Sequence, residues 1–108
     1  MSLQVVDHHP AAWFLLREAG SGDDELYLDV SCDIGAVGFS VLVKLSDAER
    51  AVYREIGRDF VESLAETIAN RPNDYRDRDL TRSLCGEVHA AVMNFKRSEE
   101  TNPEPGAR

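Results

Sequence analysis

The chain has 108 residues, of which 43% are hydrophobic and 30% are charged, and this is the size and composition of one soluble globular domain. Its 20 acidic residues outnumber the 12 lysines and arginines, so the formal net charge is -8 at pH 7. This excess of negative charge argues against binding to nucleic acid or to an anionic membrane surface, because both require clustered basic side chains.

The sequence also suggests a compartment. No apolar run approaches the ~20 residues of a membrane span, and no charged and apolar leader opens the chain. Cys32 and Cys85 both lie in apolar patterns, which is typical of buried free thiols. We therefore expect a cytoplasmic protein. Nearly all of the basic residues are arginines, and together with the frequent Ala, Asp and Val this suggests a bacterial source.

The N-terminal segments are expected to be strands. Residues 1–7 can form a short strand, which Pro10 would end because proline cannot donate to a strand ladder. Residues 11–19 contain the apolar run from Trp13 to Leu16, and periodicity alone does not assign such a run. The Gly- and Asp-rich loop at 20–24 favours a strand of a hairpin, and the alternative is a short helix that ends at Gly20.

The clearest strand covers residues 25–33. Leu26, Leu28, Val30 and Cys32 alternate along it with Tyr27, Asp29, Ser31 and Asp33, so the two sets should lie on opposite faces. Residues 36–45 alternate in the same way after a turn at Ile34 and Gly35. The two segments predict an antiparallel hairpin with one buried face.

The longest patterned segment, residues 46–70, predicts one helix. Apolar residues recur along it every four positions, namely Val52, Ile56, Phe60, Leu64 and Ile68. Ser46 and Glu49 have the spacing of a capping box. Gly57 interrupts the helix in its middle, where we expect it to mark a close approach of another part of the backbone.

A second amphipathic helix is expected from Leu80 onward, with Asp77 or Asp79 as its cap. Strands followed by helices predict an α+β fold, in which an antiparallel sheet of three to four strands in the N-terminal half carries two antiparallel amphipathic helices on one face. We expect a single domain over residues 1–97 and a disordered C-terminal tail over residues 98–108, which is rich in Pro and Glu.

Two groups of residues could carry chemistry. Asp7, His8 and His9 are adjacent and have the side-chain types of metal ligands, but no helical His spacing or paired cysteines support a metal site, so a polar loop is the favoured interpretation. Cys85 and His89 are four residues apart on the second helix, where a thiol and an imidazole can touch. A boundary histidine beside a packed cysteine is the favoured interpretation of this pair.

Two further groups could bind a partner. Tyr27, Asp29 and Asp33 are expected on the solvent face of the sheet, where they would form an acidic patch for a cation, a sugar or an arginine. Tyr75 and Arg76 are expected at the exposed connection between the helices, and both residue types are frequent at protein interfaces. For both groups, a hydrated surface is the simpler interpretation.

The leading hypothesis is a protein that binds another protein, for example to neutralise a basic partner in the manner of an immunity protein or inhibitor, because no catalytic signature is present. No cofactor is expected. One alternative is a metal-binding protein or a metal-dependent enzyme that uses His8, His9 and nearby Asp. The other is a homo-oligomer that pairs through an exposed strand edge or through the sheet face that carries Leu42.

Overall fold

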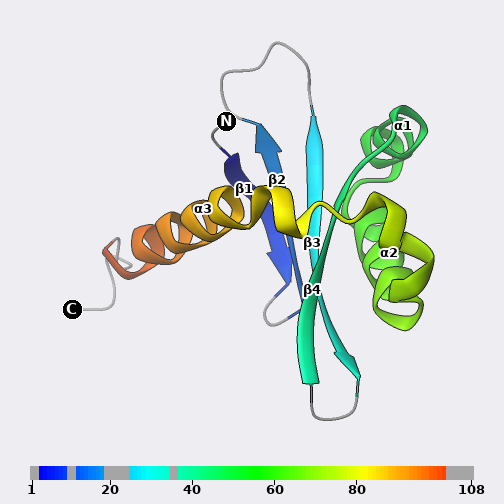
Figure 1. Ribbon diagram of the computed structural model, residues 1–108. Helices are drawn as coiled ribbons and strands as arrows, with labels where there is room; N and C mark the ends of the chain where they lie inside the picture. Colours follow the sequence, from blue (N-terminus) through cyan, green and yellow to red (C-terminus); the bar gives the residue numbers. More distant parts are fainter. Residues whose placement is uncertain (1–2, 10–11, 19–24, 35–36, 102–108) are drawn as a thin grey trace.

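The computed structural model describes residues 3–9, 12–18, 25–34 and 37–101, without the side chains of residues 33, 34, 37 and 98–101. Four strands come first and helices follow (Figure 1). In chain order the elements are β1 (Leu3–His9), β2 (Trp13–Glu18), β3 (Leu26–Ile34), β4 (Val37–Lys44), α1 (Asp47–Ile56), α2 (Arg58–Asn70), the 3-10 helix η1 (Pro72–Arg78) and α3 (Thr81–Thr101).

The strands form one antiparallel sheet in the order β1-β2-β3-β4. This confirms the predicted α+β fold with an antiparallel sheet in the N-terminal half. The apolar run from Trp13 to Leu16, which periodicity alone did not assign, lies in strand β2. Trp13 pairs with His9 of β1 on one side and with Val30 of β3 on the other. The predicted loop at 20–24 and the turn at Gly35 lie outside the described residues.

Helices cover both faces of the sheet (Figure 1). The α2 face carries Leu28 and Val30 and packs against α2, whereas the α3 face carries Tyr27 and Leu42 and packs against α3. The prediction that both helices lie on one face is therefore wrong. The reason is that Tyr27 and Leu42 make the other face of the sheet apolar as well. Their side chains are only 4% and 1% exposed, because α3 covers them and removes their apolar surface from water.

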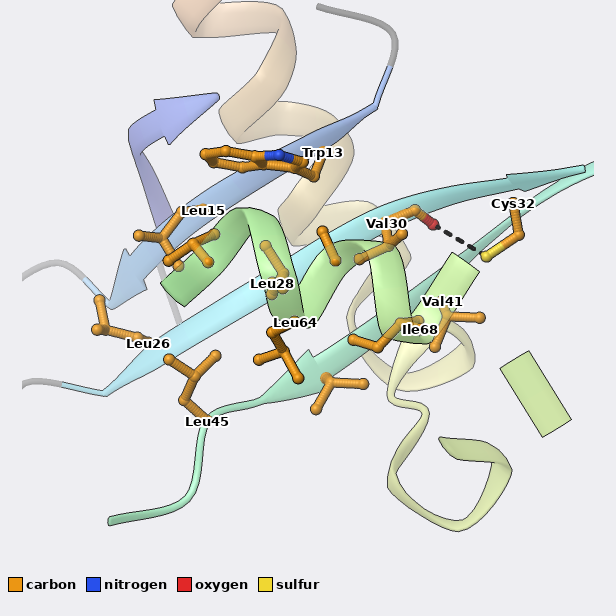
Figure 2. Close-up of a cluster of buried hydrophobic side chains, with 13 residues drawn as sticks. Trp13, Leu15, Leu26, Leu28, Val30, Cys32, Val41, Leu45, Leu64 and Ile68 are labelled. Carbon is orange, nitrogen blue, oxygen red and sulfur yellow. Dashed lines mark hydrogen bonds between the residues drawn. The ribbon is translucent and has the colours of Figure 1, made fainter. Parts of the chain in front are cut away.

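The larger core lies between the sheet and α2. Figure 2 shows this cluster, in which side chains of β2, β3 and β4 meet one side of α2. Burying each large aliphatic side chain in it contributes about 1.5–3 kcal/mol. Its members are Trp13, Leu15, Leu26, Leu28, Val30, Cys32, Val41, Val43, Leu45, Val61, Leu64, Ala65 and Ile68.

The smaller core lies between the sheet and α3. Its most buried described members are Leu3, Leu16, Tyr27, Leu42, Val88 and Ala91. Partly buried residues complete this layer, namely Val5, Phe14, Leu80, Leu84 and Val92. The α3 helix thus covers this face of the sheet with Leu84, Val88, Ala91 and Val92.

The predicted helix over residues 46–70 is two helices, α1 and α2, that meet at Gly57. The capping box is confirmed, because the Ser46 hydroxyl accepts a hydrogen bond from the Glu49 amide and the Glu49 carboxylate accepts one from the Ser46 amide. Gly57 has φ 84, a backbone angle that residues with side chains rarely adopt, and among the described residues no atom beyond its own helix and chain neighbours lies within 4 Å of a Cβ built there. The predicted close approach is wrong, and Gly57 serves the backbone turn instead.

The second predicted helix is confirmed as α3, which extends to Thr101. Residues 98–101, which were assigned to the tail, are therefore helical, and residues 102–108 of the predicted tail lie outside the described residues. Within the described part of the chain, no helix has the length and apolar character needed to cross a bilayer.

Candidate functional site

A pocket of about 250 Å³ lies between the sheet and the N-terminal part of α3. Strands β2, β3 and β4 contribute to it from one side, and α3 contributes from the other. We call it the Asp29 pocket, since Asp29 is the one carboxylate among its described lining residues. These are Phe14, Asp29, Ser40, Leu42, Thr81, Cys85, Val88, His89 and Val92.

Asp29 lies in the middle of β3, directly between Phe14 on β2 and Leu42 on β4. Burial under α3 raises the pKa of Asp29 from 3.8 to about 6, and the nearby negative charge of Asp79 adds to this rise. Near pH 7 the pocket therefore holds a carboxylate that is ionised but poorly solvated. Such a group favours a cation or a hydrogen-bond donor as its neighbour.

Asp79 fixes the position of α3 over the pocket. Its Oδ1 accepts hydrogen bonds from the Leu42 amide at 3.0 Å, the Thr81 amide at 3.0 Å and the Thr81 hydroxyl at 2.6 Å. Burial alone would raise the pKa of Asp79, but the hydrogen bonds from Thr81 and Leu42 outweigh burial and hold it below its usual value. The Leu80 amide also donates to the Leu42 carbonyl at 2.7 Å, so the start of α3 is attached to β4.

Asp79, one of the two residues predicted to cap α3, accepts a hydrogen bond from the amide of Thr81, the first residue of this helix, and its second role at β4 was not predicted. An aspartate before a helix indicates a cap, but a bond to a strand 37 residues away leaves no local signal in the sequence.

Cys85 and His89 lie beside each other in the lining of the pocket, as their helical spacing predicts. Cys32 is buried as expected, but Cys85 is exposed. The reason is that Leu84 and Val88 face the sheet. Cys85 follows Leu84 directly and therefore points about 100° around the helix axis from it, toward solvent. Among the described residues, no hydrogen bond joins the thiol, the imidazole and the Asp29 carboxylate, so the arrangement offers three polar groups around one apolar cavity.

The predicted acidic patch is not a solvent face. Tyr27 is only 4% exposed, and burial raises the pKa of its hydroxyl, whereas Asp29 is half-buried in the pocket. The prediction of a solvent face was wrong because it placed α3 on the same face as α2, whereas α3 covers the face that carries Tyr27. Asp33 pairs with Gly38 in the β3–β4 ladder, and its side chain lies outside the described part of the structure.

Tyr75 and Arg76 lie on η1, and they are not part of the Asp29 pocket. Tyr75 is half-buried and packs against the larger core, with the Arg78 guanidinium 5.8 Å from the centre of its ring. Arg76 is exposed and donates to Asn73 Oδ1 at 3.3 Å. Of Tyr75 and Arg76, which were both predicted at an exposed interface, only Arg76 is exposed.

The candidate metal ligands are separated by the geometry of β1. The strand has an irregularity between Val5 and Asp7, after which Asp7 pairs with Leu15 and His8 pairs with Phe14. The His8 ring consequently packs on the α3 face, where its centroid lies 4.8 Å from the centroid of the Phe95 ring. His9 instead lines a pocket on the α2 face, and the Asp7 carboxylate binds an arginine of α2. Among the described residues, no group of three potential ligands is placed to hold a metal ion.

Arg58 is a residue whose role sequence reasoning missed. Its Nη1 donates to Asp7 Oδ1 at 2.6 Å, its Nη2 donates to the His8 carbonyl at 3.0 Å, and its guanidinium lies 5.1 Å from the centre of the Trp13 ring. Within α2, Arg58 also binds the Glu62 carboxylate. Its contacts with β1 are about fifty positions away in the chain, so no local pattern could have predicted them.

No family model, curated protein or solved structure matches the chain.

Proposed function

We propose that the chain acts by binding another protein and that the Asp29 pocket receives a basic side chain of that partner. The observation that carries this proposal is the half-buried carboxyl group of Asp29 in a largely apolar pocket, with a pKa raised to about 6. No lysine or arginine is among the described lining residues. An incoming cation would supply the missing positive charge and would favour the ionised carboxylate.

The size of the pocket supports a side chain as its occupant. Pockets for drug-sized ligands and cofactors usually have volumes of about 300–1,000 Å³. The Asp29 pocket, at about 250 Å³, is smaller than this range. It suits a single long side chain better than a nucleotide or another large cofactor.

Arginine fits this pocket better than lysine. The apolar stem of an arginine would lie against Leu42 and Val88, and its guanidinium can donate two parallel hydrogen bonds to one carboxylate. The guanidinium is also less strongly hydrated than an ammonium group, so it loses less on entering an apolar pocket. The net charge of -8 would attract a basic partner during diffusion and speed its association.

The simplest test titrates the protein with N-acetyl-arginine amide and follows the amide signals of Asp29, Leu42 and Val88 by NMR. N-acetyl-citrulline amide is the matched control, because it has a similar shape without the charge. We expect saturable shifts for the arginine compound only, and stronger binding as the pH rises through about 6. Equal shifts with both compounds would contradict the proposal.

The partner itself can be sought in a lysate of the source organism, with the wild type, Asp29→Asn and the control Asp59→Asn as baits. Asp59 is exposed on α2, so its variant has the same charge change at a distant surface. We expect one stoichiometric partner, lost at high salt and with Asp29→Asn but retained with Asp59→Asn. A bulky maleimide on the exposed Cys85 should also block binding, whereas Cys32 is only 2% exposed and shielded from the reagent. Retention of the partner by Asp29→Asn would refute the role of the pocket.

A further inference from the structure

A groove of about 200 Å³ lies between α1 and strands β1 to β3, on the face of the sheet opposite to the Asp29 pocket. Its described lining residues are Val6, Arg17, Leu26, Arg50, Tyr53 and Arg54, and we call it the arginine groove. Three of these side chains are positively charged and none is negatively charged, in a chain of net charge -8. We propose that the arginine groove binds a small oxyanion, namely a carboxylate or phosphate group attached to a short apolar group.

The three arginines come from two separate elements. Arg17 lies on β2 opposite Leu26, whereas Arg50 and Arg54 are one turn apart and therefore on the same side of α1. The Arg50 side chain is only 16% exposed, so its stem is already held in place by packing. An oxyanion that enters the groove would meet guanidinium groups from both sides, and less conformational entropy would be lost than with freely moving side chains.

The oxyanion must compete with existing contacts of these arginines. Arg17 Nη2 donates to the amide oxygen of Gln4 at 3.2 Å, and Arg50 forms an ion pair with Asp47. Arg54 also has an interaction within the chain. The Asp47 side chain is 95% exposed, so its ion pair is well solvated and contributes little. A ligand reached by two guanidinium groups would form charge-assisted hydrogen bonds to both of them, in place of the neutral Gln4 contact and the single ion pair with Asp47.

The groove also has an apolar part. Leu26 is buried and Tyr53 is half-buried, but Val6 on the edge strand β1 is 48% exposed. The apolar group of a ligand would cover Val6 and would gain from its removal from water. This combination favours an amphipathic anion over inorganic phosphate, which has no apolar group to place there.

The test titrates the full chain, labelled with ¹⁵N, with phenyl phosphate and with benzoate. Inorganic phosphate and phenol are the controls, since each has one half of the proposed chemistry. We expect saturable shifts at Leu26 and Tyr53 with at least one of the two amphipathic anions, weaker binding of inorganic phosphate and no binding of phenol. The relative affinities of phenyl phosphate and benzoate will show whether the groove prefers a phosphate or a carboxylate.

Variants with exposed side chains locate the site. The double variant Arg17→Gln/Arg54→Gln should weaken binding about tenfold or more, since it removes two charge-assisted hydrogen bonds. Arg82→Gln, on the exposed side of α3, should leave affinity unchanged. The proposal is overturned by non-saturable shifts with both anions, by equal affinity of the double variant or by equally strong binding of phenol. Because the groove and the Asp29 pocket lie on opposite faces, these outcomes do not affect the proposed function.

Discussion

The α2 face and the α3 face of the sheet are both covered by helices, but their packing and polarity differ. Under α2, a continuous apolar cluster includes side chains with no exposed area, such as Leu28 and Ile68 (Figure 2). Under α3, the buried cluster is smaller and borders the Asp29 pocket, where a carboxyl group replaces an apolar contact. We infer that the α2 face mainly stabilises the fold, whereas the α3 face gives up stability to hold a polar group in a cavity.

The largest expected effect tests the packing of the α2 face. Ile68→Ala should lower the free energy of unfolding by roughly 2–5 kcal/mol, because Ile68 has 0% exposure in the larger core. Leu84→Ala on α3 is the matched change on the other face, and it should cost about 1–2 kcal/mol because Leu84 is only partly buried. Urea denaturation followed by circular dichroism measures both values. Equal losses would contradict the difference between the faces.

The second prediction concerns the pH dependence that Asp29 gives to the α3 face. Its pKa is about 6 in the folded chain against an ordinary 3.8, so the folded state binds the proton more tightly than the unfolded state. Neutral Asp29 thus contributes stability that is present below pH 3.8 and is lost as the pH rises to about 6, by up to about 3 kcal/mol.

The asparagine side chain of Asp29→Asn is neutral at every pH, so this variant does not lose folding stability when Asp29 of the wild type ionises. Relative to the wild type, the variant should therefore gain stability between pH 3.8 and about 6, and should keep that gain at higher pH. Urea denaturation at a series of pH values measures the difference. Asp59→Asn, an exposed change on α2, serves as the control. Parallel profiles of wild type and Asp29→Asn would show that the pKa of Asp29 is not raised.

The contrast between the faces also shows what the sequence could predict. The period-two alternation from Leu26 to Cys32 correctly gave a strand with one strongly apolar side, and the four-residue stripes correctly gave helices. The second face was harder to predict, because its apolar character depends on single residues such as Tyr27 and Leu42 among polar neighbours. Such residues can equally stand on a hydrated surface, and only the position of α3 decides their environment.

The Asp29 pocket could be predicted only in part. The sequence indicated Asp29, and separately the neighbours Cys85 and His89, because each depends on local alternation or helical spacing. It could not show that the strand and the helix bring these residues together, since this requires the connection through η1 and the bond from Asp79 to β4. The contact of Arg58 with β1 was missed for the same reason.

The third prediction compares two glycines. Gly57 lies between α1 and α2 with φ 84 and ψ -143, a conformation that costs a residue with a side chain about 1–3 kcal/mol. Gly86 lies within α3, where alanine should stabilise the helix by about 0.5–1 kcal/mol. In the described part of the chain, no atom beyond the chain neighbours and the helix's own backbone lies within 4 Å of a Cβ built at either position, so tertiary clashes do not affect the comparison. Thermal or urea unfolding of Gly57→Ala and Gly86→Ala should give changes of opposite sign, and changes of the same sign would contradict this explanation.

The smallest expected effect concerns the attachment of β1, which differs between the faces. On the α2 face, Asp7 and Arg58 form an ion pair, with side chains that are 29% and 44% exposed. On the α3 face, the His8 ring contacts the Phe14 and Phe95 rings at centroid distances of 5.6 and 4.8 Å. A partly solvated ion pair contributes up to about 1 kcal/mol and weakens in salt, whereas ring contacts contribute about 0.5–1.5 kcal/mol through packing.

Two double-mutant cycles can separate these contributions. The first combines Asp7→Asn with Arg58→Met, because methionine keeps an apolar stem next to Trp13 while it removes the charge. The second combines His8→Ala with Phe95→Ala. Unfolding in urea at low and high sodium chloride should show a coupling between Asp7 and Arg58 that decreases with salt, and a coupling between His8 and Phe95 that does not. If both couplings respond to salt equally, the two faces do not hold β1 by different forces.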